Sequence, residues 1–295
     1  MTIQVDAIVG GTEYDLTGSG ITILEVADLG HAPLERHTER GPNQHGDTDT
    51  GFRLLPRVFS IVVMLRGEDA DEVFSERARL IRIFKTSRVQ LALRFTFEDG
   101  SQRQIDCVTV GGLDLRRDGK AGKTQKTAVM LRAANPLFYD PNSGDGVTIN
   151  LGGGSGGFSV PMSVPHGVGS STADASQALT YDGTWESNPV IRITGPITSP
   201  VITNETTGDV LDFTGTTISA GSYYDIDTRY GYKTVYSESG VNKISTLLDT
   251  SDLATFALLP EPDAADGINV ISVTGSGINS DTRVDVSFTD WYVGI

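Results

Sequence analysis

Cysteine, tryptophan and long apolar runs are scarce in this chain of 295 residues. Cys107 is the only cysteine, which excludes an intramolecular disulfide and a zinc site built on cysteine. No stretch approaches the roughly 20 apolar residues that a membrane helix needs. The first residues, MTIQVDAIVGG, contain no basic segment followed by an apolar run, so neither a signal peptide nor a membrane partner is expected. The sequence therefore predicts a soluble protein made in a reducing cytoplasm.

Basic residues are nearly missing from the second half of the chain. The whole chain holds 23 Lys+Arg and 38 Asp+Glu. Residues 1–141 contain 18 basic and 20 acidic residues, so the remainder contains 5 basic and 18 acidic residues. Nucleic-acid binding relies on Lys and Arg that displace the counterions of the phosphates. We therefore expect the second half to present a solvated acidic surface that does not bind DNA or RNA.

The first half is predicted to be mostly strand with one helix. Residues 89–110 alternate in VQLALRFTF, turn at EDGS and return in QIDCVTV, which is typical of a β-hairpin. Residues 67–88 begin acidic and end basic, which favours an amphipathic helix capped by Asp69 or Asp71. The stripe expected to be buried consists of Val73, Phe74, Leu80, Ile81 and Phe84. One helix on an antiparallel sheet makes residues 1–141 an α+β domain.

A segment without periodicity, residues 36–57, interrupts these strands. We expect a long loop, and loops of this length inside a compact domain are usually functional or disordered. Phe52, Leu54 and Leu55 give the segment apolar anchors, and Arg57 ends it. These four residues are therefore candidates for a contact between subunits, and a mobile surface loop is the alternative.

The first domain is expected to end in NPLFYDP, residues 135–141. Pro136 and Pro141 donate no backbone hydrogen bond and favour extended geometry in the residues before them. Phe138 and Tyr139, between the prolines, are predicted to pack back on the sheet while the chain leaves toward a second domain. Both aromatic residues are therefore also interface candidates, at the junction of the domains.

The composition changes after this segment. Residues 142–178 are rich in Gly, Ser and Pro and are predicted to be a linker or an extended arm. From residue 179 to 295 the chain consists of short runs rich in Thr, Val, Ile and Tyr, with turn signals every 8–12 residues. That pattern is typical of a β-sandwich. The fold class expected overall is mainly β.

The side-chain patterns of enzymes are missing. The histidines lack the helical spacing of a zinc protease, and no G-x-S-x-G motif occurs. DGKAGKT, residues 118–124, has Arg117 where a phosphate-binding loop needs its first glycine, and it leads into a predicted strand. We therefore expect no catalysis and no cofactor. A weak surface metal site around His37 and His45 is an open alternative.

Sugar binding is the second alternative. Trp185, Tyr223, Tyr224 and Trp291 could stack on sugar rings, although packing in a core or an interface explains them equally well. The carboxylates of the YDID sequence, Asp225 and Asp227, share one face of a strand, and we interpret the pair as an exposed edge or a turn-forming feature. Glycoside hydrolysis needs two carboxylates that face each other, normally from different elements.

The order of these features resembles the distal tail proteins of long-tailed phages. The resemblance is carried by GFRLLPRVFSIVVMLRG (51–67) and NPLFYDP in the first half. In the second half it is carried by GTWESNPVIRITGPITSPVITNETTG (183–208) and AGSYYDIDT (220–228). It covers nearly the whole chain, although residues 142–178 are longer than such a protein needs.

The resemblance implies a homohexameric ring at the tail tip of the virion. The first domain would build the ring with a fold related to tail tube proteins, and the second would be a galectin-like β-sandwich. Its partners would be the tail tube protein and the tail-tip hub or a tail-associated fibre or lysin protein, and DNA would only pass through the channel. A carbohydrate-binding adhesion module and another tail protein, a tube or hub subunit, are the alternatives.

Overall fold

The computed structural model describes residues 3–18, 20–85, 89–111, 113, 115, 123–144, 146–152 and 172–295. The chain forms two units, Met1–Asn142 with Tyr292–Ile295, and Ser143–Trp291. The sequence predicted domains over residues 1–141 and 179–295. The structure differs in two respects. Its last four residues, Tyr292–Ile295, belong to the first unit, and its second unit already begins at Ser143.

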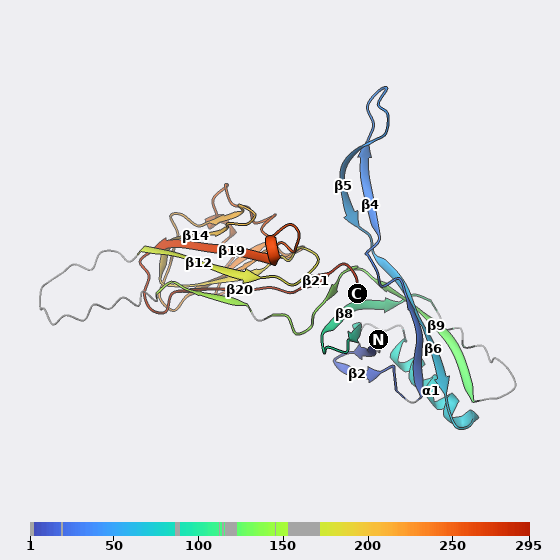
Figure 1. The fold of residues 1–295 in the computed structure, drawn as a ribbon. Coiled ribbons are helices and arrows are strands. Elements are labelled where there is room, and N and C mark those ends of the chain that lie inside the picture. Colours follow the sequence, from blue (N-terminus) through green and yellow to red (C-terminus); the bar gives the residue numbers. More distant parts are fainter. Residues whose placement is uncertain are drawn as a thin grey trace, which may run out of the picture. The chain divides into compact units, whose positions relative to one another are not determined.

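The first unit is built on one large antiparallel sheet (Figure 1). Its strands are β1 (Gln4–Val9), β2 (Thr12–Asp15), β3 (Ile21–Ala27), β6 (Arg57–Arg66), β7 (Leu91–Thr96), β8 (Gln102–Thr109), β9 (Thr124–Ala133) and β10 (Phe138–Tyr139). They follow the order β2-β1-β7-β8-β9-β6-β3, and β10 pairs with β8 and with β21 (Trp291–Tyr292). The hairpin predicted over residues 89–110 is confirmed as β7 and β8.

Period-two patterning explains where the core of this unit lies. Val5 and Ala7 on β1 and Leu93 and Phe95 on β7 are all buried, on the side of the sheet that the pattern predicts. Thr124 begins β9, which confirms a strand where a phosphate-binding loop would need a helix, although residues 116–122 lie outside the described part.

Helix α1 (Ala70–Ile83) packs against β6 and begins as the sequence predicts. The side chain of Asp69 accepts hydrogen bonds from the backbone N–H groups of Asp71 and Glu72, at 3.0 and 2.9 Å. Asp69 is therefore the N-cap, which satisfies two of the backbone donors left free at the start of the helix.

The predicted buried stripe of α1 is wrong at two positions. Val73, Leu80 and Phe84 are buried, whereas Ile81 is exposed and Phe74 is 67% exposed. At 3.6 residues per turn, Phe74 and Ile81 lie about 100° round the helix from the buried side. They form an apolar stripe on the outward face of the helix.

Residues 36–57 are not a loop, which corrects the prediction. They contain most of a hairpin, β4 (Leu34–Glu39) paired with β5 (Thr48–Leu54), which forms a separate two-stranded sheet. This hairpin extends away from the rest of the first unit (Figure 1). Every residue of β4 is exposed, so no apolar alternation marks the strand in the sequence.

The second unit consists of two five-stranded antiparallel sheets. One has the order β11-β20-β13-β17-β18, and the other has β12-β19-β14-β15 with β16 paired to β14. The strands of the first sheet are β11 (Val147–Asn150), β13 (Val190–Thr194), β17 (Tyr223–Asp227), β18 (Thr234–Ser237) and β20 (Arg283–Ser287). Those of the second are β12 (Thr172–Thr180), β14 (Ile197–Asn204), β15 (Val210–Asp212), β16 (Thr217–Ile218) and β19 (Ile268–Ser276).

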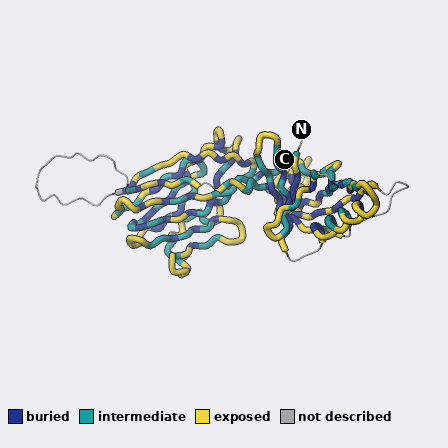
Figure 2. The backbone as a smooth tube through the Cα atoms, turned by 90° about the horizontal axis from the view of Figure 1, so that it is seen from below, coloured by how far each residue is buried: buried dark blue, intermediate teal, exposed yellow. Residues whose placement is uncertain are grey.

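One apolar core joins these two sheets, as in a β-sandwich. It contains Ile191 and Ile226 from one sheet and Ile202 and Val273 from the other. Figure 2 shows the buried residues running along the strands of each unit, with exposed residues at the turns. Strand β11 and all but the last two residues of β12 lie in the segment 142–178 that was expected to be a linker, so that prediction is wrong for these strands. Residues 153–171 lie outside the described part.

Candidate functional site

The proline-flanked segment at the end of the first unit is anchored by Phe138. This side chain is fully buried, and its ring meets the ring of Phe95 edge to face, with the centroids 6.0 Å apart. The guanidinium of Arg57 lies 5.0 Å from the Phe138 centroid, within the range of a cation–π contact. The packing of Phe138 against its own sheet is what NPLFYDP leads us to expect.

Arg57 is buried among backbone carbonyl oxygens. Its Nε donates to Pro136 O at 3.0 Å, and its Nη2 donates to Val293 O at 2.8 Å. Its Nη1 donates to Asp28 O at 2.6 Å and to Gly30 O at 2.9 Å. Burial lowers the pKa of the guanidinium, and the nearby Asp28 opposes this shift. The prediction of Arg57 as a subunit contact is wrong, because the side chain is enclosed within its own unit.

Arg57 thereby joins segments that are far apart in the sequence, including the C-terminal one. The C-terminal residues also bond directly, because Ile295 N donates to Leu29 O at 3.1 Å. Gly294 lies so close to Gly30 that a Cβ added there would stand 2.6 Å from the Gly30 carbonyl oxygen. The last residues of the chain are therefore part of the first unit's fold.

Tyr139 points to the other side of the strand from Phe138. Its hydroxyl accepts a hydrogen bond from Gln104 Nε2 at 2.5 Å and donates to Asp106 Oδ1 at 3.0 Å. Burial raises the pKa of Tyr139 to about 12, and the negative charge of Asp106 adds to this effect. Tyr139 thus fixes β10 on β8 through polar contacts, whereas Phe138 does so through the core.

Cys107, on the same strand as Asp106, makes the stability of this unit sensitive to alkali. Burial, with a contribution from Asp106, raises the pKa of the thiol from 9.0 to about 12. The folded state therefore keeps a proton that the unfolded chain loses above about pH 9, so stability falls as the pH rises through this range. We expect a loss on the order of 2 kcal/mol between about pH 9 and 10.5 from the thiol alone.

Urea unfolding at about pH 8 and 10.5 measures this loss. Cys107→Ala should flatten the pH dependence while lowering the stability at the lower pH. Equal slopes for the variant and the parent protein would show that the thiol is not responsible.

The hairpin β4–β5 has no buried side chain, and exposed ion pairs add to the backbone pairing between its two strands. Arg53 and Glu35 approach to 2.6 Å, and a similar pair joins Arg36 and Asp49. Phe52 is 52% exposed on β5, and Leu54 and Leu55 are half-buried at its base. Of the residues predicted for a subunit contact, Phe52 is thus the one that the structure leaves most accessible. The structure does not bring it together with Phe138 or Arg57.

Sequence reasoning missed an apolar patch on the outward face of β8, β9 and β6. Val58 and Val108 are exposed and lie opposite Arg132 on either side of β9, and Met130 is exposed two residues away. The signal was available in TAVMLRA, where Met130 occupies the face that alternates with buried Val129 and Leu131. Such a patch on a sheet marks a surface that could contact another protein.

The aromatic residues predicted to stack on sugars are not gathered in one site. Tyr224 is buried and meets Phe213 edge to face, with ring centroids 6.2 Å apart, so it is unavailable to a ligand. Tyr223 is covered in part by Arg192, whose guanidinium carbon lies 4.1 Å from the ring centroid.

Trp185 and Trp291 form an isolated β-bridge with each other and are half-buried. The hydroxyl of Tyr181 bonds to both strands of this bridge, because it donates to Trp185 O and accepts from Trp291 N. The two tryptophans therefore pair at the end of the second unit, whose last residue is Trp291.

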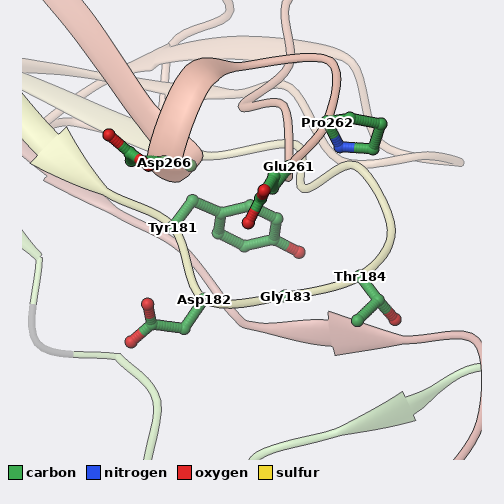
Figure 3. A pocket seen from close by; sticks show the side chains of 8 residues that line it. Tyr181, Asp182, Gly183, Thr184, Glu261, Pro262 and Asp266 are labelled. Atoms are coloured by element: carbon green, nitrogen blue, oxygen red, sulfur yellow. The ribbon is translucent and has the colours of Figure 1, made fainter.

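The described part of the second unit has hollows on its surface. The first, about 390 Å³, is lined by Tyr181, Asp182, Thr184, Glu261 and Asp266 among others (Figure 3). Figure 3 shows the carboxylates of Asp182 and Asp266 on one side of the Tyr181 ring and Thr184 on the other. In the part of the chain that the structure describes, no group of three His, Cys, Asp or Glu side chains could hold a metal. A metal site in this hollow is therefore not supported, and neither is the alternative of a metal site around His37 and His45.

The second hollow is a groove on the outward face of β13, β17, β18 and β20, with a volume of about 460 Å³. Asp225 and Asp227 both line it. The interpretation of this pair as an exposed edge is wrong, because β17 pairs with β13 on one side and β18 on the other. The alternative of a turn-forming feature holds for Asp227, whose Oδ1 accepts a hydrogen bond from the backbone N–H of Arg229 at 3.0 Å.

None of the helices in the described ranges has the length and apolar character needed to cross a membrane.

Comparison with known proteins relates this fold to phage tails. Residues 11–127 match the family model of the phage tail protein RIFT-related domain. No curated protein matches the sequence. The crystal structure of the Dit protein of phage SPP1, described as a paradigm of hub adsorption apparatus in phages that infect Gram-positive bacteria, is similar over 97% of this chain and 98% of that chain. The TM-score is 0.61 at 15% sequence identity.

The baseplate of phage p2 in its activated conformation with Sr contains a chain with lower similarity. That likeness covers 98% of both chains, with a TM-score of 0.44 and 10% identity. Residues 11–127 thus match a phage tail protein RIFT-related domain, and the whole chain shares the mainly β fold of the SPP1 Dit protein, in agreement with the predicted resemblance to the distal tail proteins.

Proposed function

We propose that this protein forms a homohexameric ring at the tail tip of a long-tailed phage. The ring joins the tail tube protein to the tail-tip hub or to a fibre or lysin protein, and DNA passes through its channel. The protein acts as a structural component without catalysis or a cofactor. The observation that carries the proposal is the likeness to SPP1 Dit over nearly the full length of both chains, together with the tail domain over residues 11–127.

Two surfaces of the first unit support the proposal of a ring. Closing a ring needs two different surfaces of one subunit that fit each other head to tail. The hairpin β4–β5 offers one exposed surface, and the apolar patch of Val58, Val108 and Met130 offers another. With 18 basic and 20 acidic residues in 1–141, the first unit carries little net charge to oppose contact between copies. The acidic second unit supports solubility of the assembly.

Light scattering over a range of protein concentrations, with negative-stain images, tests the ring. Six copies of the 31.5 kDa chain in a closed ring support the proposal. Three copies would favour a hub subunit instead. A chain that stays monomeric alone and forms no ring on tail tubes would contradict the proposal.

Phe52→Glu is expected to prevent ring closure without unfolding the protein. Phe52 is 52% exposed on a hairpin that has no buried side chain, so the change should alter stability by less than about 0.5 kcal/mol. A charge at a buried contact between subunits would leave that charge without a partner. Tyr230→Glu is the matched control, because Tyr230 is 93% exposed and belongs to the second unit. Rings that form normally with Phe52→Glu would remove the hairpin from the interface.

A further inference from the structure

The groove of about 460 Å³ on the second unit is crossed by two parallel rows of side chains. Asp285, Arg192, Asp225 and Tyr236 are successive register partners on β20, β13, β17 and β18. The adjacent row runs Ser287, Val190, Asp227 and Thr234 on the same four strands. These side chains alternate with the buried ones of the sandwich core, so they all face outward.

Every carboxylate of the groove has its own arginine. Arg192 binds Asp225 through two bonds, Nε to Oδ1 at 2.6 Å and Nη2 to Oδ2 at 2.9 Å. Arg229 binds Asp227 at 2.7 Å. Arg283 binds Asp285 at 3.2 Å, and Thr148 also donates to Asp285.

This concentration of arginine is unusual for the second unit. After residue 141 the chain has 5 basic and 18 acidic residues, and its three arginines are Arg192, Arg229 and Arg283. All three thus pair with the three aspartates of one groove. Because the charges balance locally, the groove has no net charge with which to attract a metal cation or a phosphate. An acidic surface that served solubility alone would not need its carboxylates neutralised.

The groove nevertheless keeps free hydrogen-bonding capacity and an apolar surface. An ionised carboxylate offers about four acceptor positions and a guanidinium five donors, and the ion pairs use only some of these. Tyr236, at the end of one row, is 41% exposed. Val190 adds an apolar surface in the adjacent row. Fixed donors and acceptors beside an aromatic ring match a ligand with hydroxyl groups on one side and C–H groups on another.

We propose that this groove binds a neutral saccharide. The carboxylates of Asp225 and Asp285 and the guanidinium of Arg192 bond to the sugar hydroxyls, and the Tyr236 ring packs against the face of the sugar ring. The four aromatic residues that the sequence suggests for sugar binding are not among those lining this site. The proposal is separate from the ring, because all its residues belong to the second unit.

Saturation-transfer NMR and calorimetry on the full chain test the proposal with glucose, galactose, N-acetylglucosamine and rhamnose as probes. Inorganic phosphate and Ca²⁺ serve as charged comparisons. We expect saturable binding of at least one neutral sugar and none of either ion. Asp225→Asn should weaken binding by about tenfold or more, since it removes a charged acceptor. Tyr236→Ala should weaken it similarly while leaving the fold intact, because Tyr236 lies at the surface.

Tyr230→Ala is the matched control, because this tyrosine is more exposed than Tyr236 and does not line the groove. It should bind sugar as the parent protein does. Failure of all four sugars to bind, binding of phosphate or Ca²⁺ alone, or sugar binding unchanged in Tyr236→Ala would each overturn the proposal. These outcomes do not depend on the number of copies in solution, so they are distinguishable from a failure of the ring.

Discussion

Arg57→Met is expected to lower the free energy of unfolding by at least about 4 kcal/mol, from the loss of four buried hydrogen bonds at about 1 kcal/mol or more each. Met has a similar length but no donor, so the carbonyls of Asp28, Gly30, Pro136 and Val293 would lose their partner. Such a loss is a large fraction of the total stability of most domains. Urea denaturation followed by circular dichroism measures it.

Two further variants keep this prediction testable if Arg57→Met does not fold. Arg57→Lys keeps the charge but offers three donors to four acceptors, so it should lie between the parent protein and Arg57→Met. Arg53→Met is the control, because Arg53 forms an exposed ion pair with Glu35 and should change stability by less than about 1 kcal/mol. If Arg57→Met and Arg53→Met were equally stable, Arg57 would not fasten these segments together.

Phe138→Ala is expected to cost about 3–5 kcal/mol, the usual range for removing a buried phenylalanine side chain. Phe138 is fully buried, and the change would remove its edge-to-face contact with Phe95 and its contact with Arg57. The cavity would lie beneath β10, the strand from which the chain enters the second unit. Thermal unfolding of the variant and the parent protein measures the loss.

Phe74→Ala is the control, because it makes the same substitution at an exposed position. Phe74 is 67% exposed on α1, and Ala has the higher helix propensity, so the change should be neutral within about 0.5 kcal/mol. If Phe138→Ala and Phe74→Ala unfolded at the same temperature, Phe138 would not be the anchor of the segment.

Much of the fold could be predicted because the relevant signals are local. The alternation in residues 91–96 and the capping residue Asp69 act on their own neighbours in the chain, and both predictions are confirmed. The proline-flanked NPLFYDP also marks the end of the longer of the first unit's two segments, Met1–Asn142.

The hairpin β4–β5 escaped prediction because neither of its strands has a buried face. Its strands are matched through cross-strand ion pairs such as Arg53 with Glu35, and these produce no apolar period in the sequence. A charged segment with glycines is indistinguishable from a loop when periodicity is the only criterion.

The sequence by itself determined a mainly β chain with one amphipathic helix, a change of charge near residue 141 and a resemblance to distal tail proteins. These properties follow from composition and local order, which the chain carries before it folds. Only the tertiary structure decided that Arg57 is buried, that the last four residues complete the first unit, and that three arginines each pair with one of the three aspartates lining a groove. The physical reason is that these contacts depend on strand register and on carbonyl groups, which join residues as distant as Arg57 and Val293 and leave no mark on the residue types nearby.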